Sequence, residues 1–250
     1  MICGIDVGSR RVKLVVLDKD KKEKHIFETV KFYTDFVFKN NGTLDVDVEK
    51  LGIKRDINKF VLTGYGSNNL EFKKSVIISE MKAHVLGAIY EFKLDDFTLL
   101  DIGGQDVKVV RVKEKKVRDF LTNDRCAACS GRYLENMAKL LNVSLQELGE
   151  HYKNPVRLST TCAVYGETEL IAELSRGKEK QELLAGINNS LFKKIFPMLE
   201  SLRSDTFIFT GGVAKNKALK YLIESELKTK VLVPKYPEYT GAVGCCLIKV

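Results

Sequence analysis

The feature that most constrains the fold of this chain is an internal repeat. Residues 5–8 read Ile-Asp-Val-Gly, and residues 100–103, which lie 95 positions further along, read Leu-Asp-Ile-Gly. At the same offset, residues 12–15 and residues 107–110 are both apolar apart from a lysine at the second position. Each copy ends in a lysine-rich hairpin turn. Two copies of a unit made of strand, acidic loop, strand, turn and strand predict two similar lobes within one chain.

Each repeat places an aspartate and a glycine at the point where an apolar strand ends. Glycine at such a turn lets backbone N–H groups come close to a ligand such as phosphate. An aspartate there suits a hydrated Mg²⁺, which usually binds one or two carboxylates together with phosphate oxygens. Two such loops facing each other would clamp a polyphosphate from both sides. The lysines in step with them, Lys13 and Lys108, follow the loops on a strand, and whether they contact a ligand or only reach solvent is open.

A third glycine-containing turn follows an apolar strand predicted over residues 206–209. There Thr210-Gly211-Gly212 leads into a helix predicted over 214–227, and a strand, Gly-Gly turn and helix suit the sugar or base of a nucleotide. Residues 31–39 are compatible with a strand or a helix. Residues 44–51 are compatible with a short helix, and the segment 31–58 as a whole is uninformative. Further elements expected from periodicity are strands at 2–7, 12–17, 25–30, 60–63, 97–100 and 231–233, and helices at 76–92, 127–141, 163–176, 183–202 and 240–250.

Composition limits the class of protein. With 44% apolar and 30% charged residues the chain resembles an ordinary soluble protein. No apolar run is long enough for a membrane span, and Met1 leads directly into a strand, so we expect a cytoplasmic location without a signal peptide. The net charge of +8 comes from dispersed lysines, which form a solvated surface or a docking face for an acidic partner.

Six cysteines in a reducing compartment indicate metal ligands, redox groups or core residues rather than disulfides. Cys126 and Cys162 each lie at the start of a predicted helix, where the helix dipole favours a thiolate. A thiolate is what an iron–sulfur cluster or zinc requires. Cys3, Cys245 and Cys246 are interpreted as core residues. Elsewhere, Glu80 and His84 are four residues apart on a predicted helix, and a surface or interlobe hydrogen bond is favoured over a metal pair.

Five motifs together resemble the BadF/BadG/BcrA/BcrD ATPase family, which includes the activators of 2-hydroxyacyl-CoA dehydratases. The resemblance covers the chain apart from residues 19–58. It implies an α/β fold of two duplicated ribonuclease H-like lobes, as in the sugar kinase/Hsp70/actin ATPases, with the nucleotide in the interlobe cleft. Residues 1–94 with 237–250 would form lobe I, and residues 95–236 would form lobe II. The motifs are TGYGSNNLEF (63–72), DIGGQDVKV (101–109), NDRCAACSGRYLENMA (123–138), STTCAVYGETELI (159–171) and TGGVAKN (210–216).

The resemblance also implies cofactors and partners. The protein would be a homodimer with one [4Fe–4S] cluster on its two-fold axis, held by Cys126 and Cys162 of each subunit. Two thiols per subunit are half of a Cys₄ set, which two-fold symmetry completes. ATP hydrolysis to ADP would drive one electron from a donor such as ferredoxin or flavodoxin onto an iron–sulfur dehydratase, in an anaerobic setting. A double-cubane reductase and a benzoyl-CoA reductase are alternative partners, and neither nucleic acid nor a membrane is expected.

Roles carried over by the resemblance fall on the three loops. Asp6 and Asp101 would organise Mg²⁺, and Gln105 would orient the attacking water, as glutamine does in other NTPases. One departure is Cys129, which stands where the family generally has glycine; it is a spectator, an alternative ligand or part of another metal site. Phosphates would lie on Gly8, Ser9, Gly103 and Gly104, and adenosine beside Gly211 and Gly212.

Two other functions fit parts of the sequence. A small-molecule kinase of the same fold is disfavoured because no separate catalytic base is evident and the cysteine-bearing helices would have no purpose. A nucleotide-gated scaffold with a structural zinc at Cys126 and Cys129 would be colourless, whereas an iron–sulfur protein purified without oxygen is brown.

Overall fold

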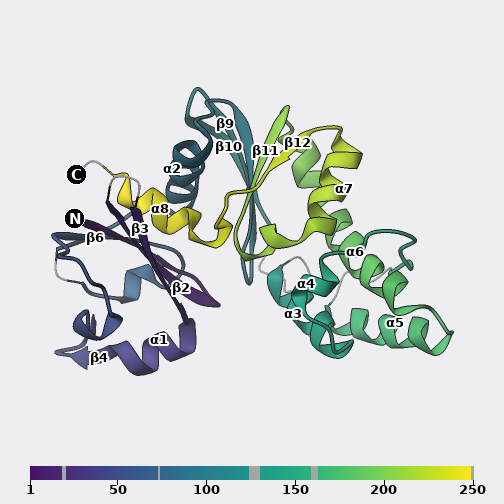
Figure 1. The fold of residues 1–250 in the computed structure, drawn as a ribbon, viewed down its shortest axis with the longest axis horizontal. Coiled ribbons are helices and arrows are strands. Elements are labelled where there is room, and N and C mark those ends of the chain that lie inside the picture. Colours follow the sequence, from purple (N-terminus) through teal and green to yellow (C-terminus); the bar gives the residue numbers. More distant parts are fainter. Residues whose placement is uncertain (19–20, 73, 124–129, 159–162, 249–250) are drawn as a thin grey trace. The chain divides into compact units, whose positions relative to one another are not determined.

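A computed structural model describes residues 1–18, 21–72, 74–123, 130–158 and 163–248 of the 250-residue chain (Figure 1). The chain divides into two compact units. The first unit comprises Met1–Leu94 together with Glu238–Val250, and the second unit comprises Asp95–Pro237. Each unit contains a five-stranded mixed sheet. The chain therefore has the two-lobed α/β architecture expected from its repeat.

In the first unit the strand order is β3-β2-β1-β6-β7. The central strand β1 pairs antiparallel with β2 and parallel with β6, and five of its six residues are buried. An apolar strand buried on both faces is typical of the middle of a sheet covered by helices. The strands are β1 Ile2–Val7, β2 Arg11–Asp18, β3 Lys21–Glu28, β6 Lys59–Thr63 and β7 Ser75–Ile77.

The second unit repeats this topology with the order β10-β9-β8-β11-β12. Its central strand β8 is buried along all six residues and again has one antiparallel and one parallel neighbour. The register repeats as well, because Asp6 is paired with Lys13 and Asp101 with Lys108. The strands are β8 Phe97–Ile102, β9 Val107–Lys113, β10 Lys116–Thr122, β11 Thr206–Thr210 and β12 Lys230–Leu232.

Helices cover the first sheet. Two of them, α2 and α8, lie against each other (Figure 1). A side chain at Gly244 would collide with the carbonyl oxygen of Ala83, and one at Gly87 with that of Thr240, so glycine on both helices permits the close packing predicted for the C-terminal segment. The helical segments are α1 Thr29–Phe36, α2 Glu80–Phe92, α8 Thr240–Cys246 and the short 3₁₀ turns η1 Glu49–Leu51, η2 Ser67–Asn69 and η5 Pro237–Tyr239.

The second unit has the larger core, in which side chains of β8, β9 and β11 pack with the long helix α6. Leu100, Leu191 and Phe209 are fully buried members of this cluster. None of the helices in the described part of the chain has the length and apolar character needed to cross a bilayer. The helical segments are α3 Gly131–Leu140, α4 Leu145–Leu148, α5 Ala163–Ser175, α6 Lys180–Ser201, the 3₁₀ turn η4 Gly212–Lys215 and α7 Lys217–Leu227.

Some predicted elements were wrong. Residues 44–51 are not a helix; β4 Val37–Asn40 and β5 Thr43–Val46 form a hairpin there, followed by η1. The turn is Asn41-Gly42, and both residues have positive φ (45° and 92°), as a two-residue hairpin turn requires. Helix α2 begins at Glu80 rather than at 76, because Ser79 caps its N-terminus by accepting a hydrogen bond from the backbone of Lys82.

Helix α3 also begins later than predicted. Its first residue is Gly131 and its N-cap is Ser130, four residues after the expected start at 127. Cys126 and Cys129, which we expected in or before its first turn, lie outside the described residues. Cys162, expected before α5, lies outside them as well. Their association with helix starts therefore stays a prediction.

Candidate nucleotide-binding loops

Each repeat closes its first two strands with the same four-residue turn. In the first loop, residues 8–11, the N–H of Gly8 donates to the carbonyl oxygen of Arg11 at 3.2 Å. In the second loop, residues 103–106, the N–H of Gly103 donates to the carbonyl oxygen of Asp106 at 3.0 Å. The 95-residue repeat therefore extends to the backbone conformation of the two loops expected to bind phosphate.

Asp6, one residue before the end of β1, has a carboxylate that is only half satisfied. Its side chain is 4% exposed, and Oδ2 accepts a hydrogen bond from Nζ of Lys13 at 2.9 Å. The other oxygen, Oδ1, is buried and has no hydrogen-bond partner among the residues that the structure describes. A buried acceptor without a partner lowers the stability of the folded state, and a ligand that binds to it would remove that cost. A carboxylate oxygen is the donor type that Mg²⁺ prefers, so Asp6 fits the predicted metal role.

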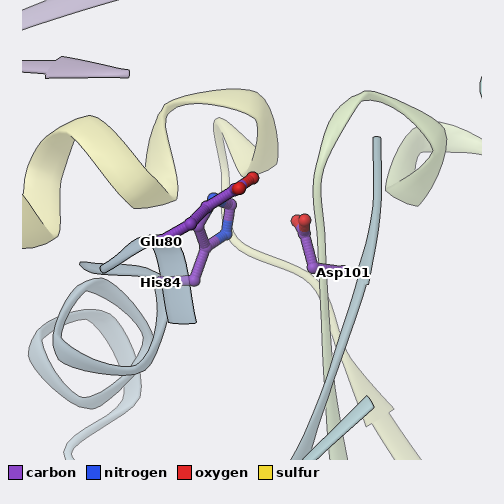
Figure 2. Close-up of side chains that lie close together, drawn as sticks. All are labelled: Glu80, His84 and Asp101. Atoms are coloured by element: carbon purple, nitrogen blue, oxygen red, sulfur yellow. The ribbon is translucent and has the colours of Figure 1, made fainter. Parts of the chain in front are cut away.

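The equivalent residue of the second repeat is bound differently. Asp101 is 3% exposed and extends from β8 (Figure 2). Its Oδ1 accepts a hydrogen bond from Oγ1 of Thr210 at 2.9 Å. Lys108, opposite Asp101 in the register, forms an ion pair with Asp106 of the second loop. Lys13 and Lys108 are thus largely buried and paired, and neither extends into solvent.

The repeat also continues into the fourth strand of each sheet, which was not predicted from the sequence. Thr63 lies beside Asp6 and Thr210 beside Asp101 in the parallel register. The glycines that come next have φ of +91° at Gly64 and +85° at Gly211. Only glycine fits there. The sequence does contain a signal, because Thr-Gly follows an apolar strand at residues 63–64 and again at 210–211. These two copies are more than 95 residues apart, so a search at the offset of the repeat does not find them.

These glycines make equivalent contacts. A Cβ at Gly64 would lie 2.7 Å from the carbonyl oxygen of Val7 and 2.8 Å from Oδ1 of Asp6. A Cβ at Gly211 would collide with the carbonyl oxygen of Ile102 and lie 2.9 Å from Oδ1 of Asp101. In each unit a bare backbone therefore covers one side of the aspartate carboxylate, and a substitution there would displace the group predicted to organise the metal.

The other predicted loop residues are accessible to a ligand. Gln105 is exposed, and Ser9 is half-buried. Gly212 is exposed, with open space where a Cβ would stand. Asn216 follows the Gly-Gly segment and is the N-cap of α7. Its side-chain oxygen accepts a hydrogen bond from the N–H of Leu219 at 2.9 Å. The Gly-Gly turn after β11 is thus held in place by the capped start of the next helix.

A model of one protein family matches residues 3–248 of the chain, the BadF/BadG/BcrA/BcrD ATPase family. The chain belongs to this family. The (R)-2-hydroxyglutaryl-CoA dehydratase activating ATPase of Acidaminococcus fermentans is 35% identical over 249 residues, which cover 98% of this chain and 95% of the relative. The family assignment confirms the resemblance expected from the five motifs.

Solved structures agree. The activator of the 2-hydroxyisocaproyl-CoA dehydratase from Clostridium difficile with bound ADPNP has a TM-score of 0.84 and 31% identity, covering 98% of this chain and 92% of that one. A ROK family glucokinase from Streptomyces griseus has a TM-score of 0.57 at 14% identity, covering 98% and 97%. The second likeness concerns the fold alone, and it confirms the predicted sugar-kinase-like architecture.

Three of the six cysteines belong to the first unit. Cys3 and Cys245 are buried, and Cys246 is half-buried with Sγ 3.2 Å from the carbonyl oxygen of Val15. Burial raises the pKa of all three thiols, that of Cys246 to about 11. Thiols with raised pKa values stay protonated at neutral pH and are poor metal ligands. They are core residues, as predicted, and no described cysteine belongs to a group of three potential metal ligands.

The remaining pair singled out by the sequence, Glu80 and His84, lies on α2 (Figure 2). A carboxylate oxygen of Glu80 and a ring nitrogen of His84 lie within 4.8 Å of each other. His84 is only 4% exposed, and its Nε2 would be 2.7 Å from a Cβ at Gly241 of α8. The histidine is therefore packed between helices of the first unit rather than on the surface.

Proposed function

We propose that this protein is an ATP-dependent one-electron donor that activates a partner iron–sulfur enzyme. Membership of an ATPase family and the likeness to a dehydratase activator with bound ADPNP support the ATPase part. The single observation that carries it is the duplicated loop with a buried, half-satisfied carboxylate at Asp6. A 2-hydroxyacyl-CoA dehydratase is the partner that fits the similar activating ATPase.

The two loops would bind the phosphates of ATP. Gly8, Ser9, Gly103 and Gly104 would line the phosphate site. The N–H groups of Gly8 and Gly103 hold the turns by donating to Arg11 and Asp106, so the N–H groups of Ser9 and Gly104 would be the ones offered to phosphate oxygens. Asp6 would hold Mg²⁺ through its unpaired Oδ1. Bound there, Mg²⁺ would neutralise negative charge on the phosphates.

The second repeat would supply the hydrolytic residues. Asp101 would act with Asp6 in organising Mg²⁺. Gln105 would orient the attacking water, which its exposure on the second loop permits. Gly211 and Gly212 would contact adenosine, and the open space at Gly212 favours this role.

Cys126 and Cys162 of two subunits would hold one [4Fe–4S] cluster in a homodimer. The buried, protonated thiols of the first unit support this choice by exclusion, because they are unsuited as ligands. Bound there, the cluster would accept and release one electron. Ferredoxin or flavodoxin would reduce it, and a double-cubane or benzoyl-CoA reductase would be an alternative acceptor.

Iron analysis tests the proposal. Protein purified without oxygen should be brown and contain about four irons per dimer, as a Cys₄-ligated cluster requires. Cys126→Ser or Cys162→Ser should lose the iron, whereas Cys129→Gly should keep it. Four irons on a strict monomer would contradict the shared site. Loss of iron in Cys129→Gly with retention in Cys162→Ser would assign the metal to the Cys126 and Cys129 pair.

A further inference from the structure

The first turn of α3 is hydrogen-bonded to the second loop. The N–H of Gly131 donates to the carbonyl oxygen of Gly103 at 2.9 Å, and the N–H of Arg132 donates to that of Gly104 at 3.0 Å. First-turn N–H groups of a helix have no partner within the helix. Here the carbonyls of a proposed phosphate-binding loop satisfy two of them, so the position of α3 depends on the orientation of that loop.

Gly131 brings the helix into direct contact with both glycine-rich segments of the second unit. A Cβ at Gly131 would lie 2.8 Å from the carbonyl oxygen of Gly103 and 3.1 Å from Cγ2 of Val213. Val213 belongs to η4, directly after the Gly211-Gly212 pair. Any larger residue at 131 would separate the helix from the loop, so the contact itself requires glycine.

The chain before α3 is tied to the same loop from its other side. The N–H of Asn123 donates to the carbonyl oxygen of Val107 at 3.2 Å, and Oδ1 of Asn123 accepts from the N–H of Val107 at 2.7 Å. Val107 is the first residue after the second loop. Residue 131 is therefore bonded to the loop and residue 123 to the residue that follows it, and the sequence between them includes Cys126 and Cys129.

The first unit contains the simpler version of this arrangement. Thr29, the first residue of α1, donates its N–H to the carbonyl oxygen of Arg10 at 3.2 Å and its Oγ1 to that of Gly8 at 2.8 Å. Helix α1 follows β3 directly, whereas residues 123–130 separate β10 from α3. Binding of the next helix to the loop is thus common to both repeats, and the cysteine-containing segment is inserted at that junction only in the second.

We propose that Gly131 is a positioning residue that transmits the nucleotide state of the second loop to α3. This inference rests on the proposed function, since it takes Gly103 and Gly104 as part of the phosphate site. A peptide unit is planar and trans, so its N–H and C=O point in opposite directions. A phosphate held by the N–H groups of Gly104 and Gln105 therefore turns the carbonyls of Gly103 and Gly104 towards Gly131 and Arg132.

Hydrogen exchange at two amides tests the inference directly. In anaerobically purified protein, adding ADPNP with Mg²⁺ should slow exchange at the Gly131 and Arg132 N–H groups about tenfold, because bound phosphate fixes their acceptors. Calorimetry on the same sample measures nucleotide binding. Binding without a change at these amides would overturn the inference and leave the proposed function standing. Absence of binding would overturn both.

A matched pair of glycine variants isolates the contact. Gly131→Ala should still bind ADPNP but lose the nucleotide-dependent change at Arg132, and electrons delivered per ATP should fall about tenfold. Gly166→Ala on α5 is the control, because among the described residues its Cβ would make two ordinary contacts, with Cε of Met137 at 3.6 Å and Cε2 of Tyr133 at 3.9 Å. A wild-type response at Arg132 in Gly131→Ala would overturn the inference.

A milder variant keeps the inference testable if Gly131→Ala does not fold. Asn123→Ala removes only the side-chain hydrogen bond to the N–H of Val107. Because it weakens one of the two attachments, we expect the nucleotide effect at Gly131 and Arg132 to shrink about threefold. A nucleotide effect of wild-type size at Gly131 and Arg132 in this variant would overturn the inference.

Discussion

The two repeats have the same strand register and loop turn but pair their charged side chains differently. In the first, Asp6 forms an ion pair with Lys13 and leaves one buried oxygen without a partner. In the second, Asp101 accepts a hydrogen bond from Thr210, and Lys108 forms an ion pair with Asp106 of the loop. The shared backbone comes from the duplicated pattern of apolar residues and glycines, whereas the pairing depends on single loop positions.

Position 106 explains the difference for the lysines. The second loop has Asp106 where the first has Arg11, at the 95-residue offset. The second loop therefore contains an acidic partner for its lysine, Lys108, and the first loop contains no acidic residue for Lys13. The connections to the next helix also differ, since α1 begins directly after β3 but eight residues, 123–130, precede α3. We propose from this comparison that the first repeat contributes more to metal binding and the second more to hydrolysis and its coupling.

Substitutions at the tips of the two loops should separate the repeats most strongly. Gln105→Ala should slow ATP hydrolysis about 1,000-fold while leaving nucleotide affinity nearly unchanged, because orienting a water is a transition-state task. Arg10→Ala, at the equivalent position of the first loop, should leave the rate within about threefold. Steady-state phosphate release and calorimetry measure the two quantities. Equal losses in both variants would remove the proposed division of roles.

The paired aspartates should differ by a smaller factor. Asp6→Asn removes the charge beside the unpaired Oδ1, so Mg²⁺-dependent binding of ADPNP should weaken about 100-fold. Asp101→Asn should weaken it only about tenfold, because an asparagine oxygen can still accept the hydrogen bond from Thr210. Calorimetry with and without Mg²⁺ separates metal-dependent from metal-independent binding. A larger loss in Asp101→Asn would reverse the assignment of the metal to the first repeat.

The two lysines should show the weakest contrast. Lys13→Met leaves the buried carboxylate of Asp6 without its cation, and the free energy of unfolding should fall by about 2 kcal/mol in the absence of nucleotide. In Lys108→Met the loss of the ion pair with Asp106 should contribute less than about 1 kcal/mol, because the Asp106 side chain is 40% exposed and can be hydrated. Denaturant unfolding of both variants measures the difference. Equal stability losses would show that the ion pairs contribute alike.

Much of the fold was predictable because the repeat and the apolar periodicity are local signals. Strand β1 and the acidic loops followed from four-residue patterns that recur, and the family resemblance supplied the lobed architecture. The hairpin at 37–46 was missed because its strands are only four residues long, although Asn41-Gly42 is a strong turn signal. The sequence of 44–51 is also compatible with a short helix, and this left the segment undetermined.

Other parts of the site depend on contacts that no local pattern contains. From the sequence alone, a Lys13 paired with Asp6 could not be distinguished from a Lys13 that extends into solvent, because the difference depends on side-chain rotamers on two neighbouring strands. The roles of Gly64 and Gly131 depend on which carbonyl each backbone meets, which the sequence does not specify. The chemistry of the loops could be predicted from their residues, but the joining of the second loop to α3 required the structure.

Hydrolysis and electron delivery are one process in the proposed function, and counting both in a single anaerobic assay tests this coupling. Protein reduced by ferredoxin or flavodoxin is mixed with the partner iron–sulfur enzyme, and electrons received are measured against phosphate released. We expect no transfer without ATP or with ADPNP, and a constant number of ATP molecules hydrolysed per electron. Equally fast transfer in the absence of ATP would contradict the coupling.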